Sequence, residues 1–254
     1  MPATPFAITF DFWNTLYSAD GSAMDMVRPR RLQALRQMLS SCKVSPSEEE
    51  LHGAYRAGFD AYMAAWTAGL HFGAPEQVRF ILEHFAVRPE AVSEELVART
   101  ASEIEEASLL APLELLPGVR DTVPGLASQG HPLGIISDNS LTPGRLLRKF
   151  LSDDGLLELF SVVTFSDETG YPKPDRRMFA TTLAGLGARP AQAAHVGDTP
   201  RTDIAGARAM GMVAIRCAAA VDHDDPPAAD FVITDHRELP GILARVKAGR
   251  LRRP

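Results

Sequence analysis

Residues 8–18 of the chain read ITFDFWNTLYS. The apolar run at the start of this stretch, residues 8–10, ends abruptly at the carboxylate of Asp11. Together with Ala7, this run is short and apolar, and it predicts a buried strand over residues 7–10. Open α/β sheets bind their ligands just outside the carboxyl ends of the strands. Asp11 follows the predicted strand directly and is therefore the first candidate for a functional residue.

Five more short apolar runs lie further along the chain, and after Asp138 they alternate with helical patterns. They cover residues 133–136, 162–165, 194–196, 213–215 and 231–233. Strands that alternate with helices are typical of a parallel sheet with helices on both faces. The sequence therefore predicts an α/β fold with a doubly wound parallel sheet, a Rossmann-like core.

A long gap separates the first predicted strand from the second. The gap is about 120 residues long and contains no convincing strand, although a parallel crossover needs only about a dozen residues. Apolar residues recur in it at helical spacing, for example Leu32, Leu35 and Leu39. We therefore predict an inserted helical domain at residues 18–113, with the α/β core formed by residues 1–17 and 114–254.

The insert also supports two local predictions. Ser45 and Glu48 have the spacing of a helix start, with Ser45 as the N-cap and Glu48 reaching back to it. Along the helix that follows, Phe59, Tyr62 and Trp66 share one face. We expect these aromatic residues to form the insert's own core rather than a wall that faces a substrate.

The composition argues against several classes of function. A net charge of −6 gives no support for a nucleic-acid or anionic-membrane partner. No apolar run approaches the roughly 18 residues of a membrane span, and the N-terminus lacks the pattern of a secretory signal. Cys42 and Cys217 are far apart and lack a metal-binding spacing. We therefore expect a reduced, cytoplasmic protein that is a monomer or a homodimer.

Four further polar residues fall at or shortly after predicted strand ends. Ser137 follows LGII, Lys173 lies in GYPKPDRRMF, and Asp198 and Asp203 lie in HVGDTPRTDIAGARAMGM. A parallel sheet gathers the carboxyl ends of its strands at one edge. We therefore expect these residues to converge with Asp11 in one crevice.

This set of residues suits phosphoryl transfer. The Asp11 carboxylate can attack phosphorus and form an aspartyl-phosphate, but two anions that approach each other need a cation between them. Asp11 and Asp198 offer the oxygen ligands that Mg²⁺ prefers. Lys173 and Ser137 can hold the transferring oxygens, since this catalysis depends mainly on positioning and electrostatics. Asp203 can anchor Lys173 or a metal-bound water.

Four segments together resemble the motifs of the haloacid dehalogenase superfamily of hydrolases. DFWNTL, IISDNS, KPDRRMF and VGDTPRTDIAGARAMGM have the order and spacing of these motifs, and the resemblance covers the whole predicted core. The third and fourth motifs are the most specific. The insert after the first strand resembles the all-helical cap type of that family.

The resemblance implies a nucleophile and a metal site. Asp11 is expected to be the nucleophile, and Thr15 to orient the loop that carries it. The backbone carbonyl of Trp13 is expected to bind Mg²⁺ together with Asp11 and Asp198.

The resemblance also implies a phosphate site. Ser137 is expected to bind phosphate, with help from backbone amides near Asp138. Lys173 is expected to neutralise the phosphate, and Asp203 to support the site from outside the set of metal ligands.

The chain departs from the family pattern at Trp13. Phosphatases of the family usually carry a second Asp at this position, which protonates the leaving group and later activates water. Indole only donates a non-acidic N–H, and general acid–base catalysis is typically worth about 10²–10⁴ in rate. The candidates for supplying the proton instead are Tyr17, Asp20, His52 and His71.

The leading interpretation is a Mg²⁺-dependent phosphohydrolase that acts on a small phosphorylated metabolite admitted by the cap. Trp13 also favours a second interpretation, because the family's hydrolytic 2-haloacid dehalogenases carry an aromatic residue there. Those enzymes need no metal, and their fourth motif usually lacks the acid that Asp198 supplies. A catalytically weak binding protein on the same fold is a third interpretation. Lys43 invites comparison with members that form a Schiff base through a cap lysine, but its surroundings, SSCKVSP, do not match.

Overall fold

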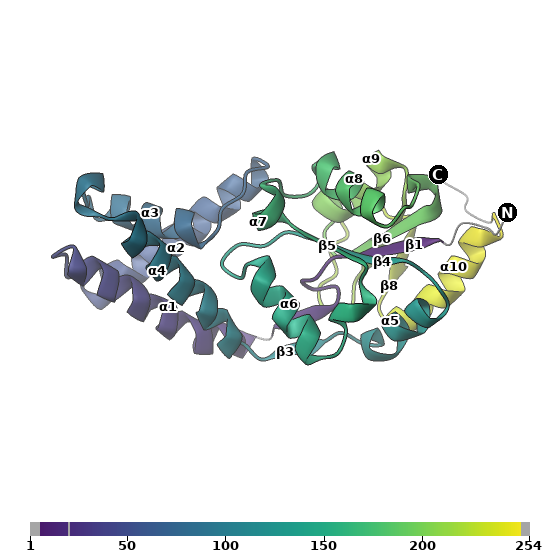
Figure 1. Cartoon of the computed structure of the whole chain (residues 1–254), viewed down its shortest axis with the longest axis horizontal. Coiled ribbons are helices and arrows are strands. Elements are labelled where there is room, and N and C mark those ends of the chain that lie inside the picture. The colour runs from purple at the N-terminus through teal and green to yellow at the C-terminus, as the bar shows by residue number, and fades with distance from the viewer. Residues whose placement is uncertain (1–5, 20, 250–254) are drawn as a thin grey trace. The chain divides into compact units, whose positions relative to one another are not determined.

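A computed structural model of the chain describes residues 6–19 and 21–249 (Figure 1). The chain folds as two compact units. The first comprises Met1–Ser18, Leu113–Asp138 and Arg148–Pro254, and the second comprises Ala19–Pro112 and Asn139–Leu147.

The first unit is built on a six-stranded parallel sheet with the strand order β5-β4-β1-β6-β7-β8. The strands are β1 (Ala7–Phe10), β4 (Leu133–Ser137), β5 (Val162–Phe165), β6 (Ala193–Gly197), β7 (Val213–Cys217) and β8 (Phe231–Ile233). The predicted α/β fold is therefore confirmed. Each apolar run that predicted a strand coincides with one of these strands to within two residues at either end.

Helices cover both faces of this sheet (Figure 1). The helices α8 (Arg176–Gly185) and α9 (Ala205–Met210) lie on one face, and α5 (Val119–Ser128) and α10 (Leu239–Lys247) lie on the other. On the first face, Ala7 and Ile136 pack in one buried cluster with Met178 and Phe179 of α8. Burial of a large apolar side chain contributes about 1.5–3 kcal/mol to the stability of the fold. In a strand that is covered on both faces, every side chain is buried, so its sequence is a continuous apolar run.

The strand register places the ends of three strands side by side. Phe10, the last residue of β1, pairs with Ile135 of β4 and with Val196 of β6. The residues that follow β1 and β6, and the last residue of β4, therefore share one edge of the sheet. This edge is where the sequence places its candidate site.

The second unit contains the long helices of the insert, α1 (Gly21–Ser41), α2 (Glu48–Thr67), α3 (Ala74–His84) and α4 (Glu94–Glu106). Their shared core includes Leu35, Leu51, Ile81 and Ile104, all fully buried. The predicted fold class, an α/β core with an inserted helical domain, is thus confirmed. None of the helices within residues 6–19 and 21–249 combines the length and the apolar character that crossing a membrane requires.

The second unit also includes residues 139–147, which the sequence-based boundaries assign to the core. Ser108 Oγ donates a hydrogen bond to Leu141 O at 3.2 Å, and Thr142 Oγ1 donates one to Ser108 Oγ at 3.0 Å. Arg31 also donates to Ser108 Oγ, at 2.8 Å. These contacts join parts of the chain that are far apart in sequence, so no local pattern could indicate them.

The predicted N-cap of α2 is wrong by two residues. Ser47 is the cap, because its hydroxyl accepts a hydrogen bond from Glu50 N at 3.3 Å. The Glu50 side chain in turn accepts one from Ser47 N at 2.8 Å. Ser45 and Glu48 have the same spacing as Ser47 and Glu50, so the capping pattern alone does not choose between the two starts.

The aromatic face of α2 does not form the core of the insert, contrary to prediction. Phe59 is 58% exposed, and Tyr62 and Trp66 are half-buried. The buried stripe of this helix consists of Leu51, Ala54, Tyr55 and Gly58. Gly58 allows a close approach to α3, since a Cβ at this position would lie 2.2 Å from Gln77 Nε2.

Two short strands were not predicted. The strands β2 (Tyr17–Ala19) and β3 (Leu113–Leu115) pair in a separate two-stranded sheet and flank the insert in sequence. Each has only three residues, which is too short for an alternating pattern to stand out.

Candidate active site

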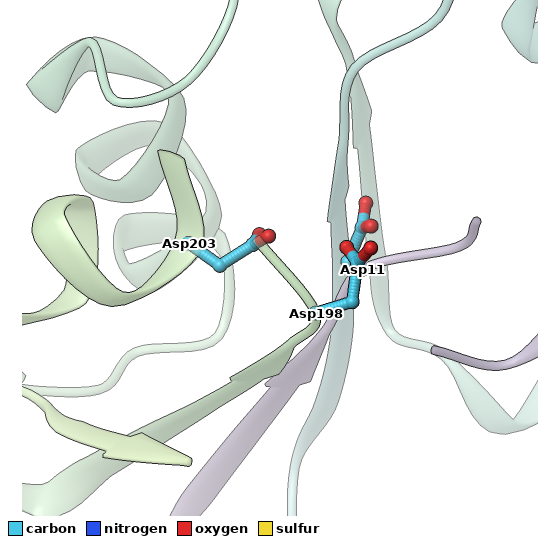
Figure 2. A group of neighbouring side chains, drawn as sticks. All are labelled: Asp11, Asp198 and Asp203. Atoms are coloured by element: carbon cyan, nitrogen blue, oxygen red, sulfur yellow. The ribbon is translucent and has the colours of Figure 1, made fainter. Parts of the chain in front are cut away.

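Three buried aspartates meet at the carboxyl edge of the sheet (Figure 2). Asp11 directly follows β1, Asp198 directly follows β6, and Asp203 lies in the short π-helical turn η5 (Pro200–Ile204). Each contributes one carboxylate oxygen to a group whose members lie within 4.8 Å of one another. The carboxylates of Asp11 and Asp198 are adjacent, and that of Asp203 points toward them (Figure 2).

Lys173 provides a positive charge within this cluster. Its Nζ donates to Asp11 Oδ1 at 2.7 Å and to Asp203 Oδ1 at 2.6 Å, and its side chain is 2% exposed. Burial by itself lowers the pKa of Lys173, but the two carboxylates outweigh burial and raise this pKa above its ordinary value. Burial, together with the charge of Asp203, raises the pKa of Asp11 above its ordinary value, although Lys173 acts in the opposite direction. The lysine therefore stays charged, and its ammonium is shared between two acceptors.

Asp203 accepts hydrogen bonds from four donors. Its Oδ1 accepts from the lysine and from His195 Nε2 at 2.9 Å, and its Oδ2 accepts from Thr199 N at 3.0 Å and from Thr202 Oγ1 at 3.4 Å. Burial raises the pKa of Asp203, but the lysine and the histidine outweigh burial and hold this pKa below its ordinary value. Gly197 permits the packing, because a Cβ there would lie 2.2 Å from Asp203 Cγ. A carboxylate offers about four acceptor sites, so those of Asp203 are occupied within the chain.

Asp198 has a different environment. Its Oδ1 accepts a hydrogen bond from Thr199 Oγ1 at 3.0 Å, and its Oδ2 accepts one from Asn14 Nδ2 at 3.4 Å. Burial, followed by the charges of the two neighbouring aspartates, raises the pKa of Asp198 to about 7. The carboxylate is therefore in a position where an added cation would stabilise its charge.

The loop after Asp11 is closed by its own backbone. Leu16 N and Tyr17 N both donate to Phe12 O at 3.0 Å, and Asn14 N donates to Tyr17 O at 2.7 Å. Asn14 adopts a φ of 53°, in the left-handed region that Asn tolerates better than most residues. This turn directs the Asn14 side chain toward the fourth motif.

The other two predicted residues of this loop differ in their surroundings. Trp13 is half-buried, and its ring packs edge-on against Phe12 with the centroids 5.0 Å apart. Thr15 is fully buried, and its hydroxyl has no hydrogen-bond partner among the residues that the structure describes. The orienting role expected of Thr15 is therefore not carried by a hydrogen bond from its hydroxyl to another described residue.

Ser137 and Asp138 lie at the end of β4 and contact the backbone of the neighbouring loops. Ser137 Oγ accepts a hydrogen bond from Phe12 N at 3.4 Å and donates one to Asp138 O at 3.2 Å. Asp138 Oδ1 accepts from Lys173 N at 2.7 Å. The Asp138 side chain thus fixes the loop that carries the lysine.

The four candidate proton donors differ in their availability. Tyr17 is 1% exposed, and its hydroxyl donates to Asp154 Oδ2 at 2.9 Å. Burial and this hydrogen bond raise the pKa of Tyr17 well above its ordinary value, which makes Tyr17 a weaker acid and disfavours it as the replacement for the missing Asp. Asp20 lies outside the described residues, and His52 and His71 belong to the helical unit.

Sequence reasoning missed three residues near the cluster. His195 and Thr9 are fully buried, and His195 Nδ1 lies 2.9 Å from Thr9 Oγ1. A histidine within the apolar run AAHVG was the available signal for a buried polar group in this strand, but it did not indicate the partner. His223 Nε2 lies 3.9 Å from Asp198 Oδ2, but its loop belongs to no motif, so nothing in the sequence pointed to it.

A model of a protein family matches most of the chain. The model of the haloacid dehalogenase-like hydrolases matches residues 7–211. The chain belongs to this family. The family membership that the four motifs indicated is confirmed, and the chain is a hydrolase of the haloacid dehalogenase-like family.

Known relatives of this hydrolase align with different fractions of its length. A bovine (Bos taurus) protein, haloacid dehalogenase-like hydrolase domain-containing protein 3, is 35% identical over 123 residues, which are 48% of this chain and 47% of the relative. The chain thus spans about half the length of that relative. The glyceraldehyde 3-phosphate phosphatase of Methanopyrus kandleri is 28% identical over 245 residues, which are 93% of this chain and 96% of the relative.

A solved structure shows the same fold along almost the whole chain. It is the 2-haloacid dehalogenase from Pseudomonas syringae, with a TM-score of 0.69 and 24% identity. The match covers 95% of this chain and 99% of that chain. It supports the assignment of the fold.

Proposed function

We propose that this hydrolase is a Mg²⁺-dependent phosphohydrolase that acts on a small phosphorylated metabolite through an aspartyl-phosphate intermediate. The observation that carries the proposal is the Asp11 carboxylate, which is buried at the sheet edge beside Asp198 with Lys173 Nζ 2.7 Å from its Oδ1. A relative that matches almost the whole chain is named glyceraldehyde 3-phosphate phosphatase, which supports a small phosphorylated substrate. We also propose that the helical insert, residues 18–113, serves as the cap that selects this substrate.

Release of inorganic phosphate from a panel of small phosphate esters tests this proposal. The panel should include p-nitrophenyl phosphate, glyceraldehyde 3-phosphate and other short sugar phosphates. We expect turnover of several panel members in the presence of Mg²⁺. A folded protein that releases no phosphate from any of them would contradict the proposal.

The acidic cluster fits a hard divalent cation. Three buried carboxylates face the single ammonium of Lys173, and the pKa of Asp198 is raised to about 7. All the donors are oxygens, which favours Mg²⁺ over softer metals. The acceptor sites of Asp203 are occupied, so we assign the ion to Asp11, Asp198 and the backbone carbonyl of Trp13. When bound, the ion supplies positive charge that lets an anionic substrate approach Asp11.

Each residue of the proposed site has its own role in the reaction. Lys173 holds Asp11 Oδ1, and we assign the attack on phosphorus to Oδ2 of the same carboxylate. The new bond between Oδ2 and phosphorus forms as the bond to the leaving oxygen breaks. Ser137 and the backbone amides near Asp138 hold the phosphoryl oxygens. Water then attacks the phosphorus as the bond between Oδ2 and phosphorus breaks. The protons of the water leave with the phosphate, and the Asp11 carboxylate is restored.

A second candidate function rests on Trp13. The family's 2-haloacid dehalogenases carry an aromatic residue at this position, so the side chain favours a reaction in which Asp11 attacks carbon and a halide leaves. The buried Asp198 carboxylate beside Asp11 favours the phosphohydrolase, because two adjacent carboxylates offer the oxygen ligands that a divalent cation prefers. Halide release from 2-haloacids without added metal would support the second candidate.

We expect Mg²⁺ to bind the metal-free protein, and Asp198→Asn to weaken this binding by more than about tenfold. The substitution removes one of the carboxylates assigned to the ion. Isothermal titration calorimetry measures the affinity, and Asp121→Asn, on the exposed face of α5, is the matched control. No heat of Mg²⁺ binding, together with activity that a chelator does not reduce, would count against the metal site.

Trp13 is expected to restrict the enzyme to good leaving groups. An alkoxide must depart largely unprotonated without a carboxylic acid at this position, whereas an aryl oxide or a carboxylate needs less help. The rate should therefore fall steeply as the pKa of the leaving group rises, and Trp13→Asp should flatten that dependence by restoring up to about 10²-fold on alkyl phosphates. Rates on a series of substituted phenyl and alkyl phosphates give, for each of the two proteins, the dependence of the rate on the pKa of the leaving group.

The opposite result for Trp13 is also informative. Equal wild-type rates for aryl and alkyl esters, with the chemical step shown to be rate-limiting, would mean that another acid is in place. His223, 3.9 Å from Asp198, would then be the first residue to substitute.

A further inference from the structure

A line of buried polar contacts runs from the sheet interior to the candidate nucleophile. Thr9 Oγ1 lies 2.9 Å from His195 Nδ1, and His195 Nε2 lies 2.9 Å from Asp203 Oδ1. The same Asp203 oxygen accepts from Lys173 Nζ at 2.6 Å, and the lysine also donates to Asp11 Oδ1 at 2.7 Å. The active-site motifs explain the last three residues of this line but not the first two.

The inner end of the line is rigidly held. Thr9 and His195 are partners in the register of β1 and β6, two adjacent central strands, and both are fully buried. Phe179 of α8 packs edge-on against the imidazole with the ring centroids 5.2 Å apart. Thr9 Oγ1 also lies 3.2 Å from Ala194 O. The imidazole therefore has one packed position in the core.

We propose that His195, held by Thr9, is a positioning residue that fixes the Asp203 carboxylate and thereby aims Lys173 at Asp11. An ionised carboxylate only accepts hydrogen bonds, so the proton on this contact belongs to His195 Nε2. The inference rests on the proposed phosphohydrolase function for its effect on rate. The contacts themselves do not depend on that function.

The physical reason is competition between two acceptors for one ammonium. The hydrogen bond from His195 draws electron density from Asp203 Oδ1 and so balances the attraction of Lys173 toward the two aspartates. Removal of this donor leaves Asp203 a stronger acceptor and free to shift, so the ammonium moves toward Asp203 and away from Asp11. A misplacement of about 1 Å in an active site lowers the rate by about 10²-fold.

Kinetics of p-nitrophenyl phosphate hydrolysis test the proposal. His195→Leu, which fills the space but donates nothing, should lower kcat by about 10–100-fold and change KM by less than about threefold. His195→Gln, whose amide can donate to Asp203, should recover most of the loss. His131→Leu is the matched control, because His131 is also a buried histidine but bonds Phe6 O at the amino edge of the sheet. It should keep the wild-type kcat.

An NMR signal tests the contact without any turnover. Lys43, Lys149 and Lys247 are exposed, so their ammonium protons exchange rapidly with water, whereas the buried and doubly bonded Lys173 should give a protected ¹H–¹⁵N signal. This signal should shift or disappear in His195→Leu and remain unchanged in His131→Leu. If His195→Leu does not fold, Thr9→Val replaces it. This substitution removes the hydroxyl that contacts His195 Nδ1 and Ala194 O, and it should shift the same signal.

The outcomes separate the two proposals. A wild-type protein that releases no phosphate would overturn the proposed function, and the NMR signal alone would then decide the positioning role. If His195→Leu keeps kcat within about twofold of wild type and leaves the Lys173 signal in place, the positioning role is wrong. It is also wrong if His195→Gln, properly folded, loses as much as His195→Leu in both readouts.

Discussion

Asp11→Asn is expected to abolish phosphate release, with kcat lower by about 10⁴-fold or more. An amide has almost no nucleophilicity toward phosphorus and cannot form the acyl phosphate on which the proposed reaction depends. The Asn side chain has nearly the same size and still offers an oxygen to Lys173. The measurement is phosphate release by the purified variant under conditions that saturate the wild-type enzyme.

Two controls make this result specific. Circular dichroism and thermal unfolding should show that Asp11→Asn is folded, and Asp121→Asn, on an exposed face of α5, should keep the wild-type kcat. Wild-type turnover by a folded Asp11→Asn protein would show that the nucleophile has been assigned to the wrong residue.

Lys173→Met is expected to lower both activity and stability, the latter by about 3–5 kcal/mol. The substitution leaves Asp11 and Asp203, both buried, without the ammonium that lies 2.7 Å and 2.6 Å from their Oδ1 atoms. Removal of one partner from a buried ion pair leaves an uncompensated charge, which is why the expected loss is large. Chemical denaturation monitored by fluorescence gives the change in the free energy of unfolding.

Lys149→Met is the matched control for Lys173→Met. Lys149 forms an exposed ion pair with Asp153 at 3.0 Å, and exposed pairs contribute only about 0–1 kcal/mol. Lys173→Met should therefore have a clearly lower free energy of unfolding than Lys149→Met. If Lys173→Met is no less stable than Lys149→Met, the buried cluster does not depend on the lysine as described.

The fold could be predicted because its signals are local. The four inner strands of the large sheet, β1, β4, β6 and β7, are buried along their whole length. Their apolar runs are therefore continuous and stand out from the helical patterns around them. The long gap after Phe10 could be recognised as an insertion because no parallel crossover needs that length. By contrast, β2 and β3 have three residues each and leave no pattern to recognise.

The convergence of the candidate residues follows from topology, but their contacts do not. The end of a parallel strand predicts that Asp11 and Asp198 share an edge, and the structure places both in one group of buried carboxylates. Whether Asp203 meets Lys173, or Tyr17 turns away to bond Asp154, depends on packing between distant segments. His195 went unnoticed for the same reason, because a histidine inside an apolar strand has no local pattern that names its partner.

The exposed aromatic face of α2 shows another limit of sequence patterns. Helical periodicity showed that Phe59, Tyr62 and Trp66 share a face, but it did not show which face the helix buries. The close approach of Gly58 to Gln77 sets that orientation. Such an approach between two helices cannot be read from either helix alone.

A single turnover in H₂¹⁸O tests the central claim most directly, because it reports which atom water attacks in the covalent intermediate. With enzyme in excess over p-nitrophenyl phosphate, the account predicts that ¹⁸O appears in the released phosphate and that the peptide containing Asp11 stays unlabelled in mass spectrometry. Water that attacks phosphorus in an aspartyl-phosphate leaves both carboxylate oxygens in place. With a 2-haloacid as substrate, halide release together with ¹⁸O in the Asp11 carboxylate would instead show attack by water on an aspartyl ester, and this result would contradict the phosphohydrolase account.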